Sequence, residues 1–213
     1  MLRTGILMIA LFAVWTALIQ IVDVQSIGQK GTEVGFATFN SWVHQLTGVH
    51  MLIYTITDWL QLVPVFICLM FGTIGFVQII KRKSLLKVDL DVILLGFYYL
   101  LVVLGYFLFE MIPINYRPIL IEGRLESSYP SSTTLLVLSV MPTLIFQANR
   151  RLQSVKAKNV ISILTIIFSL FMVIARMVSG VHWITDIMGA ILLSMGLFCM
   201  YNAVVILCYR EEK

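Results

Sequence analysis

Long apolar runs alternate with short polar connections along nearly the whole chain. A hydrocarbon core is crossed by a helix of about 20 apolar residues. Segments of about that length cover residues 4–23, 58–80, 90–112, 132–148, 159–178 and 184–207. Inside a bilayer such runs satisfy their backbone polar groups by forming helices. The pattern predicts an all-α integral membrane protein with six transmembrane helices, folded as a single domain over residues 1–213.

The longest connection, residues 24–57, has a different pattern. Its stretch "VGFATFNSWVHQL" places apolar residues at helical spacing, with Trp42 among them. This spacing is typical of an amphipathic helix that lies in the membrane interface. We expect such a helix between the first two spans, with His44 and His50 as ordinary polar residues of the interface.

Basic residues in short loops indicate which side of the membrane each loop occupies. The loops "KRKSLLK" and "NRRLQSVKAK" follow the second and fourth spans. Since Lys and Arg accumulate on the cytoplasmic side, both loops should be cytoplasmic. With six spans, the N and C termini are then cytoplasmic too, and connections 24–57, 113–131 and 179–183 face outward. We expect a multi-pass plasma-membrane protein, and the short loops favour a bacterial one.

Composition excludes a soluble domain and gives no support for a metal site. The chain of 213 residues is 60% hydrophobic and 12% charged, about half the charged fraction of soluble domains. Cys68, Cys199 and Cys208 all lie inside apolar segments and show no metal-ligand or disulfide spacing. Histidines and carboxylates do not cluster at ligand spacing either, so we expect no metal and no cofactor.

The stretch "ARMVSGVHWITDIMGA", residues 175–190, places ionisable groups between the last two apolar runs. Arg176 ends span five, Ser179-Gly180 can break the helix, and His182 precedes Asp186 by four residues, a spacing that lets the two touch on a helix. A carboxylate bonded to one imidazole nitrogen leaves the other free as nucleophile or base. Because charges at membrane depth are costly, we interpret these groups as functional. The alternative is an interfacial pair of Arg176 and Asp186 beside an unrelated histidine.

The outward connection 113–131 adds a second arginine and a group of hydroxyls. Arg117-Pro118 follows span three directly, whereas Glu122, Arg124 and Glu126 suit a solvated loop with neutralising pairs. The next span begins with "YPSSTTLL", which has more hydroxyls than a helix cap needs. A helix N-terminus favours anions, and arginine forks match phosphate oxygens. The outward connections therefore predict a phosphate site with a nitrogen nucleophile.

These residues resemble the type 2 phosphatidic acid phosphatase family, membrane lipid phosphatases related to vanadium haloperoxidases. Its motifs are KxxxxxxRP, PSGH and SRxxxxxHxxxD. The third matches at Arg176, His182 and Asp186, with Ala175 in place of serine. The first matches at Arg117-Pro118 but has Glu110 at the lysine position, and the second matches at Pro130-Ser131 but has Ser132 and Thr133 in place of glycine and histidine.

The resemblance implies a metal-independent hydrolase with a phosphohistidine intermediate. His182 would attack phosphorus and Asp186 would orient it. The groups expected to hold the phosphoryl oxygens are Arg117, Arg176, Ser131, Ser132 and Thr133. Tyr116 and Tyr129 flank this set as further candidates for hydrogen bonds to phosphate.

The departures from the motifs bear on the substrate. In the family the motif-two histidine protonates the leaving group, which Thr133 cannot do near neutral pH. A phosphate monoester leaves without that help, because its relevant pKa is about 6. The missing histidine therefore favours a lipid diphosphate, such as a polyprenyl diphosphate. Glu110 is a candidate replacement acid, or an ion-pair partner of Arg117 or Arg176.

Two other functions fit the same residues. A lipid phosphotransferase would pass the phosphoryl group to an alcohol or to another lipid. A non-catalytic lipid-phosphate binder or transporter would bind the same ligand without turnover. In every case the partners are a lipid phosphate and the bilayer, and nucleic acid is not expected.

Overall fold

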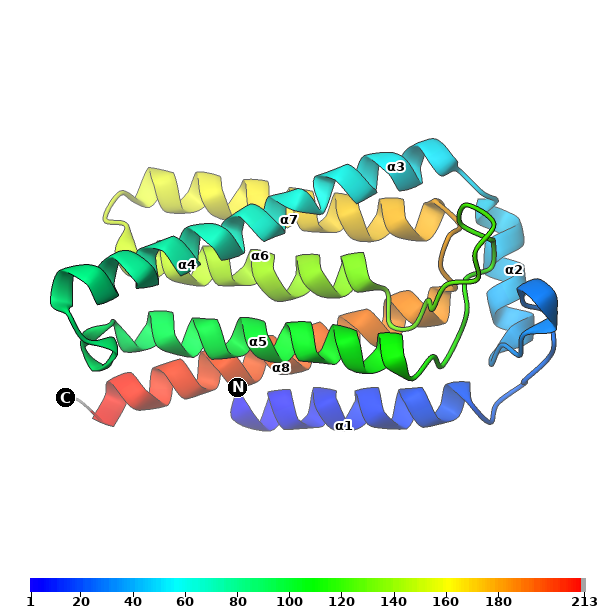
Figure 1. Cartoon of the computed structure of the whole chain (residues 1–213), viewed down its shortest axis with the longest axis horizontal. Coiled ribbons are helices and arrows are strands. Elements are labelled where there is room, and N and C mark those ends of the chain that lie inside the picture. Colours follow the sequence, from blue (N-terminus) through cyan, green and yellow to red (C-terminus); the bar gives the residue numbers. More distant parts are fainter. Residues whose placement is uncertain (212–213) are drawn as a thin grey trace.

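The structure is a computed structural model that describes residues 1–211, with side chains as far as Tyr209. The two residues that follow belong to the domain expected from the sequence but lie outside the described part of the chain. The helices in chain order are α1 (Leu2–Ile19), η1 (Gln29–Gly31), α2 (Ala37–Thr47), α3 (Met51–Leu60), α4 (Leu62–Arg82), η2 (Leu85–Lys87), α5 (Leu90–Met111), α6 (Ser132–Arg151), α7 (Val155–Val178) and α8 (Ile184–Glu211) (Figure 1).

Six helical segments are long and apolar enough to cross a membrane, which confirms the predicted architecture. Helices α3 and α4 form one of them, a run of 32 residues from Met51 to Arg82. The sequence pattern placed the start of this span at residue 58, seven residues late. The difference arises because polar residues such as Thr55 and Thr57 precede residue 58, although Thr57 faces a protein partner, Arg176, rather than lipid.

Helix α6 is the most buried of the six spans. It packs against α4, α5, α7 and α8, and these helices surround it (Figure 1). Helix α1 lies along α8 at the edge of the bundle, where small residues let the two backbones approach. A Cβ atom on Gly196 would lie only 2.7 Å from Ile9 Cδ1. The outer faces of the bundle carry exposed apolar side chains, as a bilayer requires.

The two ends of the bundle differ. The last turns of α8 and the connections 83–89 and 152–154 lie at one end, which we call the terminal end (Figure 1). The other end carries α2 and the connections 112–131 and 179–183, and we call it the loop end (Figure 1).

Helix α2 crosses the loop end at a steep angle to the spans (Figure 1), where the sequence predicts a helix between the first two spans. Its Trp42 and Leu46 are exposed, whereas Asn40 is fully buried. Asn40 Nδ2 donates to Gly35 O at 2.8 Å and to Thr185 Oγ1 at 3.0 Å. The helix is therefore fastened to the start of α8, which is the part of the chain that follows His182.

A sharp turn joins α7 to α8. Helix α7 ends at Val178, and Gly180 has a left-handed φ of 68°. A Cβ atom on Gly180 would lie 2.0 Å from Gly48 O, so only glycine fits here. The predicted helix break at Ser179-Gly180 is confirmed, and it places His182 in the turn rather than on a helix.

Candidate active site

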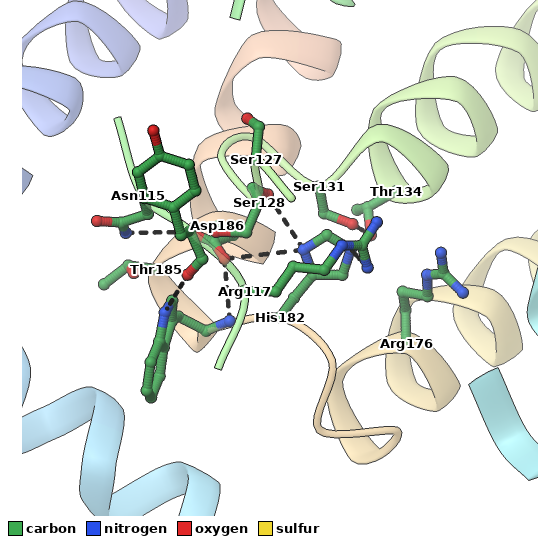
Figure 2. Close-up of polar contacts among 12 residues, drawn as sticks. Asn115, Arg117, Ser127, Ser128, Ser131, Thr134, Arg176, His182, Thr185 and Asp186 are labelled. Carbon is green, nitrogen blue, oxygen red and sulfur yellow. Dashed lines mark hydrogen bonds and ion pairs between the residues drawn. The ribbon is translucent and has the colours of Figure 1, made fainter. Parts of the chain in front are cut away.

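His182 is held in one tautomer by its two ring contacts. Its Nδ1 lies 3.1 Å from the carbonyl oxygen of Ser128, which can only accept, so Nδ1 carries the hydrogen (Figure 2). Its Nε2 is then unprotonated and accepts from Arg117 Nη1 at 3.4 Å. The side chain is buried. The free lone pair of the imidazole is thus aimed at a guanidinium group.

The environment keeps this imidazole neutral. Burial lowers the pKa of His182 well below its ordinary value of 6.5, and the charges of Arg117 and Arg176 lower it further. A neutral imidazole with a free Nε2 is the form that acts as a nucleophile. His182 therefore keeps its nucleophilic form at neutral and mildly acidic pH.

Asp186 forms hydrogen bonds with groups around His182 and none with the imidazole ring itself. Its Oδ2 accepts from Trp183 N at 2.9 Å, and its Oδ1 accepts from Asn115 Nδ2 at 3.1 Å (Figure 2). Oδ2 lies 3.7 Å from His182 Nδ1, which is an ion-pair distance and not a hydrogen bond. The sequence predicts that the carboxylate fixes the tautomer from the same helix face. The structure assigns that bond to Ser128 O instead, because His182 precedes the first residue of α8.

Arg117 is anchored by the loop that follows it. Its Nε lies 3.1 Å from Glu126 Oε2, and its backbone N donates to Glu126 O at 3.1 Å. Glu126, expected in a neutralising pair of a solvated loop, therefore forms that pair with Arg117. Glu110, the other proposed partner, is exposed and forms no ion pair with Arg117 or Arg176 in the described part of the chain.

Arg176 is almost completely buried, and its partners come from α3. Its Nη1 donates to Thr57 Oγ1 at 2.9 Å, and its Nη2 lies 3.8 Å from Asp58 Oδ1. The alternative pair of Arg176 with Asp186 is not formed, because the carboxylate near Arg176 is Asp58. The ring of Tyr54 lies 4.7 Å from Arg176 Cζ and 6.0 Å from Arg117 Cζ. One aromatic ring thus lies within cation–π distance of two like charges.

The hydroxyls at the start of α6 divide into different roles. Ser131 is buried and its Oγ donates to Thr134 Oγ1 at 3.0 Å, at the N-cap position of the helix (Figure 2). Thr133 Oγ1 donates to Gln61 Oε1 at 3.0 Å. Of the three hydroxyls expected to bind phosphate, Ser132 is the one that lines the cavities described below.

The two tyrosines proposed as further phosphate contacts hold the scaffold. The Tyr129 hydroxyl lies 2.7 Å from Thr16 Oγ1 on α1, and its ring stacks on Phe12. Tyr129 is 1% exposed, although it reaches the wall of one cavity. Tyr116 contributes its carbonyl oxygen, which accepts from Trp183 Nε1 at 2.8 Å.

Two cavities meet at Arg117. The first, of about 200 Å³, is bordered by Glu110, Arg117, Glu126, Ser132 and His182 among others, and we call it the histidine cavity. The second, of about 300 Å³, is bordered by Asp58, Gln61, Arg117, Ser132 and Arg176, and we call it the arginine cavity. Its remaining wall is largely apolar, formed by Val102, Val103, Leu135 and Leu136. The two arginines suit an anionic group, and the apolar wall suits an apolar tail attached to it.

The contribution of α3 to the site was not predicted from the sequence. Tyr54, Thr57, Asp58 and Gln61 follow the i, i+3, i+4, i+7 spacing of one helix face, and each contacts an arginine or the start of α6. This polar stripe at the edge of an apolar run is the signal that could have revealed it. Asn115 and Ser128 carried no such signal, because they act through ordinary polar contacts with His182 and Asp186.

Fold and site together define a class: a six-span helical membrane protein with a buried imidazole and two guanidinium groups at one end of the bundle. A family model described as the PAP2 superfamily matches residues 4–209. The chain therefore belongs to the PAP2 superfamily.

A solved structure supports the same fold. A transmembrane PAP2-type phosphatidylglycerolphosphate phosphatase from Bacillus subtilis superposes with a TM-score of 0.68. The two chains share 17% sequence identity, and the alignment covers 94% of this chain and 95% of the other. A comparison with curated protein sequences finds no match.

Proposed function

We propose that this chain is a metal-independent lipid phosphatase that works through a phosphohistidine on His182. The observation that carries the proposal is the tautomer of that residue. Nδ1 is tied to Ser128 O, and the lone pair of Nε2 points at the guanidinium of Arg117. A phosphoryl group bound by that guanidinium lies within reach of the nucleophile.

Binding begins at the two guanidinium groups. The phosphoryl oxygens accept hydrogen bonds from Arg117 and Arg176, and Arg117 Nη1 turns from Nε2 to an oxygen. Tyr54 and Glu126 keep the guanidinium of Arg117 in place during this exchange. The apolar wall of the arginine cavity takes the first part of the lipid chain.

The chemical step creates charges next to protein groups that are already fixed to stabilise them. Nε2 attacks phosphorus, the bond to the leaving oxygen breaks, and the imidazole gains a positive charge. Ser128 O and the nearby Asp186 carboxylate stabilise that charge through Nδ1. The arginines stabilise the phosphoryl oxygens, which is what phosphoryl transfer mainly requires.

The substrate we favour is a lipid diphosphate, such as a polyprenyl diphosphate. Thr133 replaces a proton donor and is itself engaged with Gln61. A lipid monophosphate leaving group departs without a proton, since its relevant pKa is about 6, whereas an alkoxide does not.

Basic residues support an outward site. The terminal end carries Lys81, Lys83, Lys87, Lys156 and Lys158 in or beside its connections. Under the positive-inside trend this end is cytoplasmic, and the loop end with His182 faces outward across a plasma membrane.

The test is a phosphate-release panel with purified protein in detergent and EDTA. It compares farnesyl diphosphate, undecaprenyl monophosphate, phosphatidic acid and phosphatidylglycerophosphate. We expect release without added metal and a preference for the diphosphate. Preference for a monophosphate would reverse the substrate assignment, and no release from any of the four would reject the phosphatase.

A further inference from the structure

Helix α3 brings a carboxylic acid to the phosphate site. Asp58 borders the arginine cavity together with both Arg117 and Arg176. It is the one carboxylic acid among the described residues that line this cavity. Its side chain is 47% exposed, so water in the cavity reaches it.

Asp58 is held in a defined orientation. Its Oδ1 accepts from Gln61 Nε2 at 2.9 Å and lies 3.8 Å from Arg176 Nη2. Gln61 is fixed in turn, because its Oε1 accepts from Thr133 Oγ1 at 3.0 Å. Both contacts of the carboxylate use Oδ1, which leaves Oδ2 for a hydrogen bond to water.

The position relative to His182 decides what this carboxylate can do. The Arg117 guanidinium lies between the His182 ring and Arg176 (Figure 2), and Arg117 lines both cavities. A phosphoryl group held there has Nε2 on one side and the arginine cavity on the other. In an in-line displacement, the leaving group departs and the water arrives on the side away from the histidine.

We propose that Asp58 is the general base that activates water to hydrolyse the phosphohistidine, an inference that rests on the proposed function. Asp58 takes a proton from water as the water oxygen bonds to phosphorus. The bond between phosphorus and Nε2 breaks, and its electron pair returns to the imidazole. The products are inorganic phosphate and neutral His182, and Asp58 then releases its proton to solvent.

The other two carboxylates that line the two cavities have the wrong position for this step. Glu110 and Glu126 line the histidine cavity, on the side of the nucleophile. Glu126 is also occupied by Arg117 Nε at 3.1 Å. A lipid diphosphate needs no acid in the first step, so a single base on the far side completes the cycle.

The test separates the two halves of the reaction. Farnesyl diphosphate labelled with ³²P at its terminal phosphate is mixed with Asp58→Asn, and phosphoprotein and free phosphate are measured after rapid quenching. Loss of the base slows hydrolysis of the intermediate by roughly 10²- to 10⁴-fold but leaves its formation nearly unchanged. Labelled phosphohistidine should therefore accumulate on the variant and not on the wild type.

Two matched variants complete the design. Glu110→Gln, the carboxylate on the other side, should not accumulate phosphoprotein, and neither should Glu122→Gln, which changes an exposed loop carboxylate. Asp58→Ser repeats the measurement if the asparagine variant does not fold. Added formate should then restore hydrolysis of the intermediate, because it supplies the missing carboxylate.

The outcomes are distinguishable. If Asp58 only positions Arg176, its loss slows formation and hydrolysis alike and no phosphoprotein accumulates, which overturns the inference. Wild-type protein that releases no phosphate and never becomes labelled overturns the proposed function itself.

Discussion

The two ends of the bundle use arginines differently. At the terminal end, Arg151 Nη2 lies 2.8 Å from Asp91 Oδ2, and Arg82 Nη1 lies 2.8 Å from Asp89 Oδ1. Arg151 also reaches Asp89 at 3.4 Å, and Arg150 lies 3.7 Å from Asp91. Each of these three guanidinium groups has a carboxylate partner.

At the loop end Arg117 and Arg176 are more buried but less completely paired. Arg176 is 1% exposed, and its nearest carboxylate is 3.8 Å away. Its short hydrogen bond goes to the neutral hydroxyl of Thr57. Arg117 donates to the neutral ring of His182 as well as meeting Glu126.

The difference is what we expect between a structural charge network and the proposed phosphate site. Matched pairs at the terminal end fasten α5 and α6 to the loop between α4 and α5. Two guanidiniums with mostly neutral partners leave positive potential in a cavity, which is costly for folding and suited to a phosphoryl group. The following predictions test whether that separation holds.

The largest expected effect is the loss of the nucleophile. His182→Gln removes the free imidazole nitrogen and should reduce phosphate release by roughly 10³-fold or more. Thermal unfolding in detergent should change little, because the glutamine amide can still donate to Ser128 O. Full retention of phosphate release would show that the loop end is not a catalytic site.

The next effect is the loss of one guanidinium. Arg117→Gln removes a charged donor from the phosphoryl oxygens and should reduce kcat by about 10²- to 10³-fold. The matched change at the other end, Arg151→Gln, should leave kcat close to that of wild type, because Arg151 pairs with Asp89 and Asp91 at the end of the bundle away from His182. Equal losses at the two ends would remove the distinction between them.

A smaller effect concerns pH. Burial and the charges of Arg117 and Arg176 lower the pKa of His182, so the acid limb of kcat/KM should lie well below pH 6.5. Activity falls as the pH drops through the lowered pKa, because protonation removes the lone pair of Nε2. Arg117→Gln removes one of the lowering charges, so its residual activity should show an acid limb at higher pH. If the acid limb stays at the same pH in Arg117→Gln, a group other than His182 is responsible for it.

The smallest effect on activity belongs to the terminal end. Asp91→Asn leaves Arg151 and Arg150 without their shared carboxylate and should lower the free energy of unfolding by about 1–3 kcal/mol. Phosphate release at a temperature well below unfolding should stay unchanged. A selective loss of activity would mean that this network communicates with the site.

The sequence predicted the membrane class and the number of spans, and it singled out the main candidate site residues. A long apolar run in a bilayer satisfies its backbone hydrogen bonds by forming a helix, so the spans could be predicted from composition alone. Arg117, Arg176, His182 and Asp186 stood out because ionisable groups near a membrane need a reason. The function of these residues stays a prediction that the experiments above test.

Other contacts could not be predicted from the chain. The sequence spacing put Asp186 on the imidazole, whereas the folded turn gives Nδ1 to a backbone carbonyl of Ser128. Glu126 was expected to form a neutralising pair within its loop, and its partner in the structure is Arg117. Such pairings form where segments that are far apart in the sequence come together in the fold. The spacing of residues along the chain does not reveal where this happens.

What the sequence by itself determined is therefore the set of helices and the presence of costly charges at their ends, because both depend on local composition and on the solvent around a segment. What only the tertiary structure decided is which partner each charge has. Tyr54 lies against two arginines, and Asp58 reaches the cavity that they share, because α3 packs against α7 at the loop end. A side chain's chemistry depends on the few ångströms around it, and only packing brings those neighbours together.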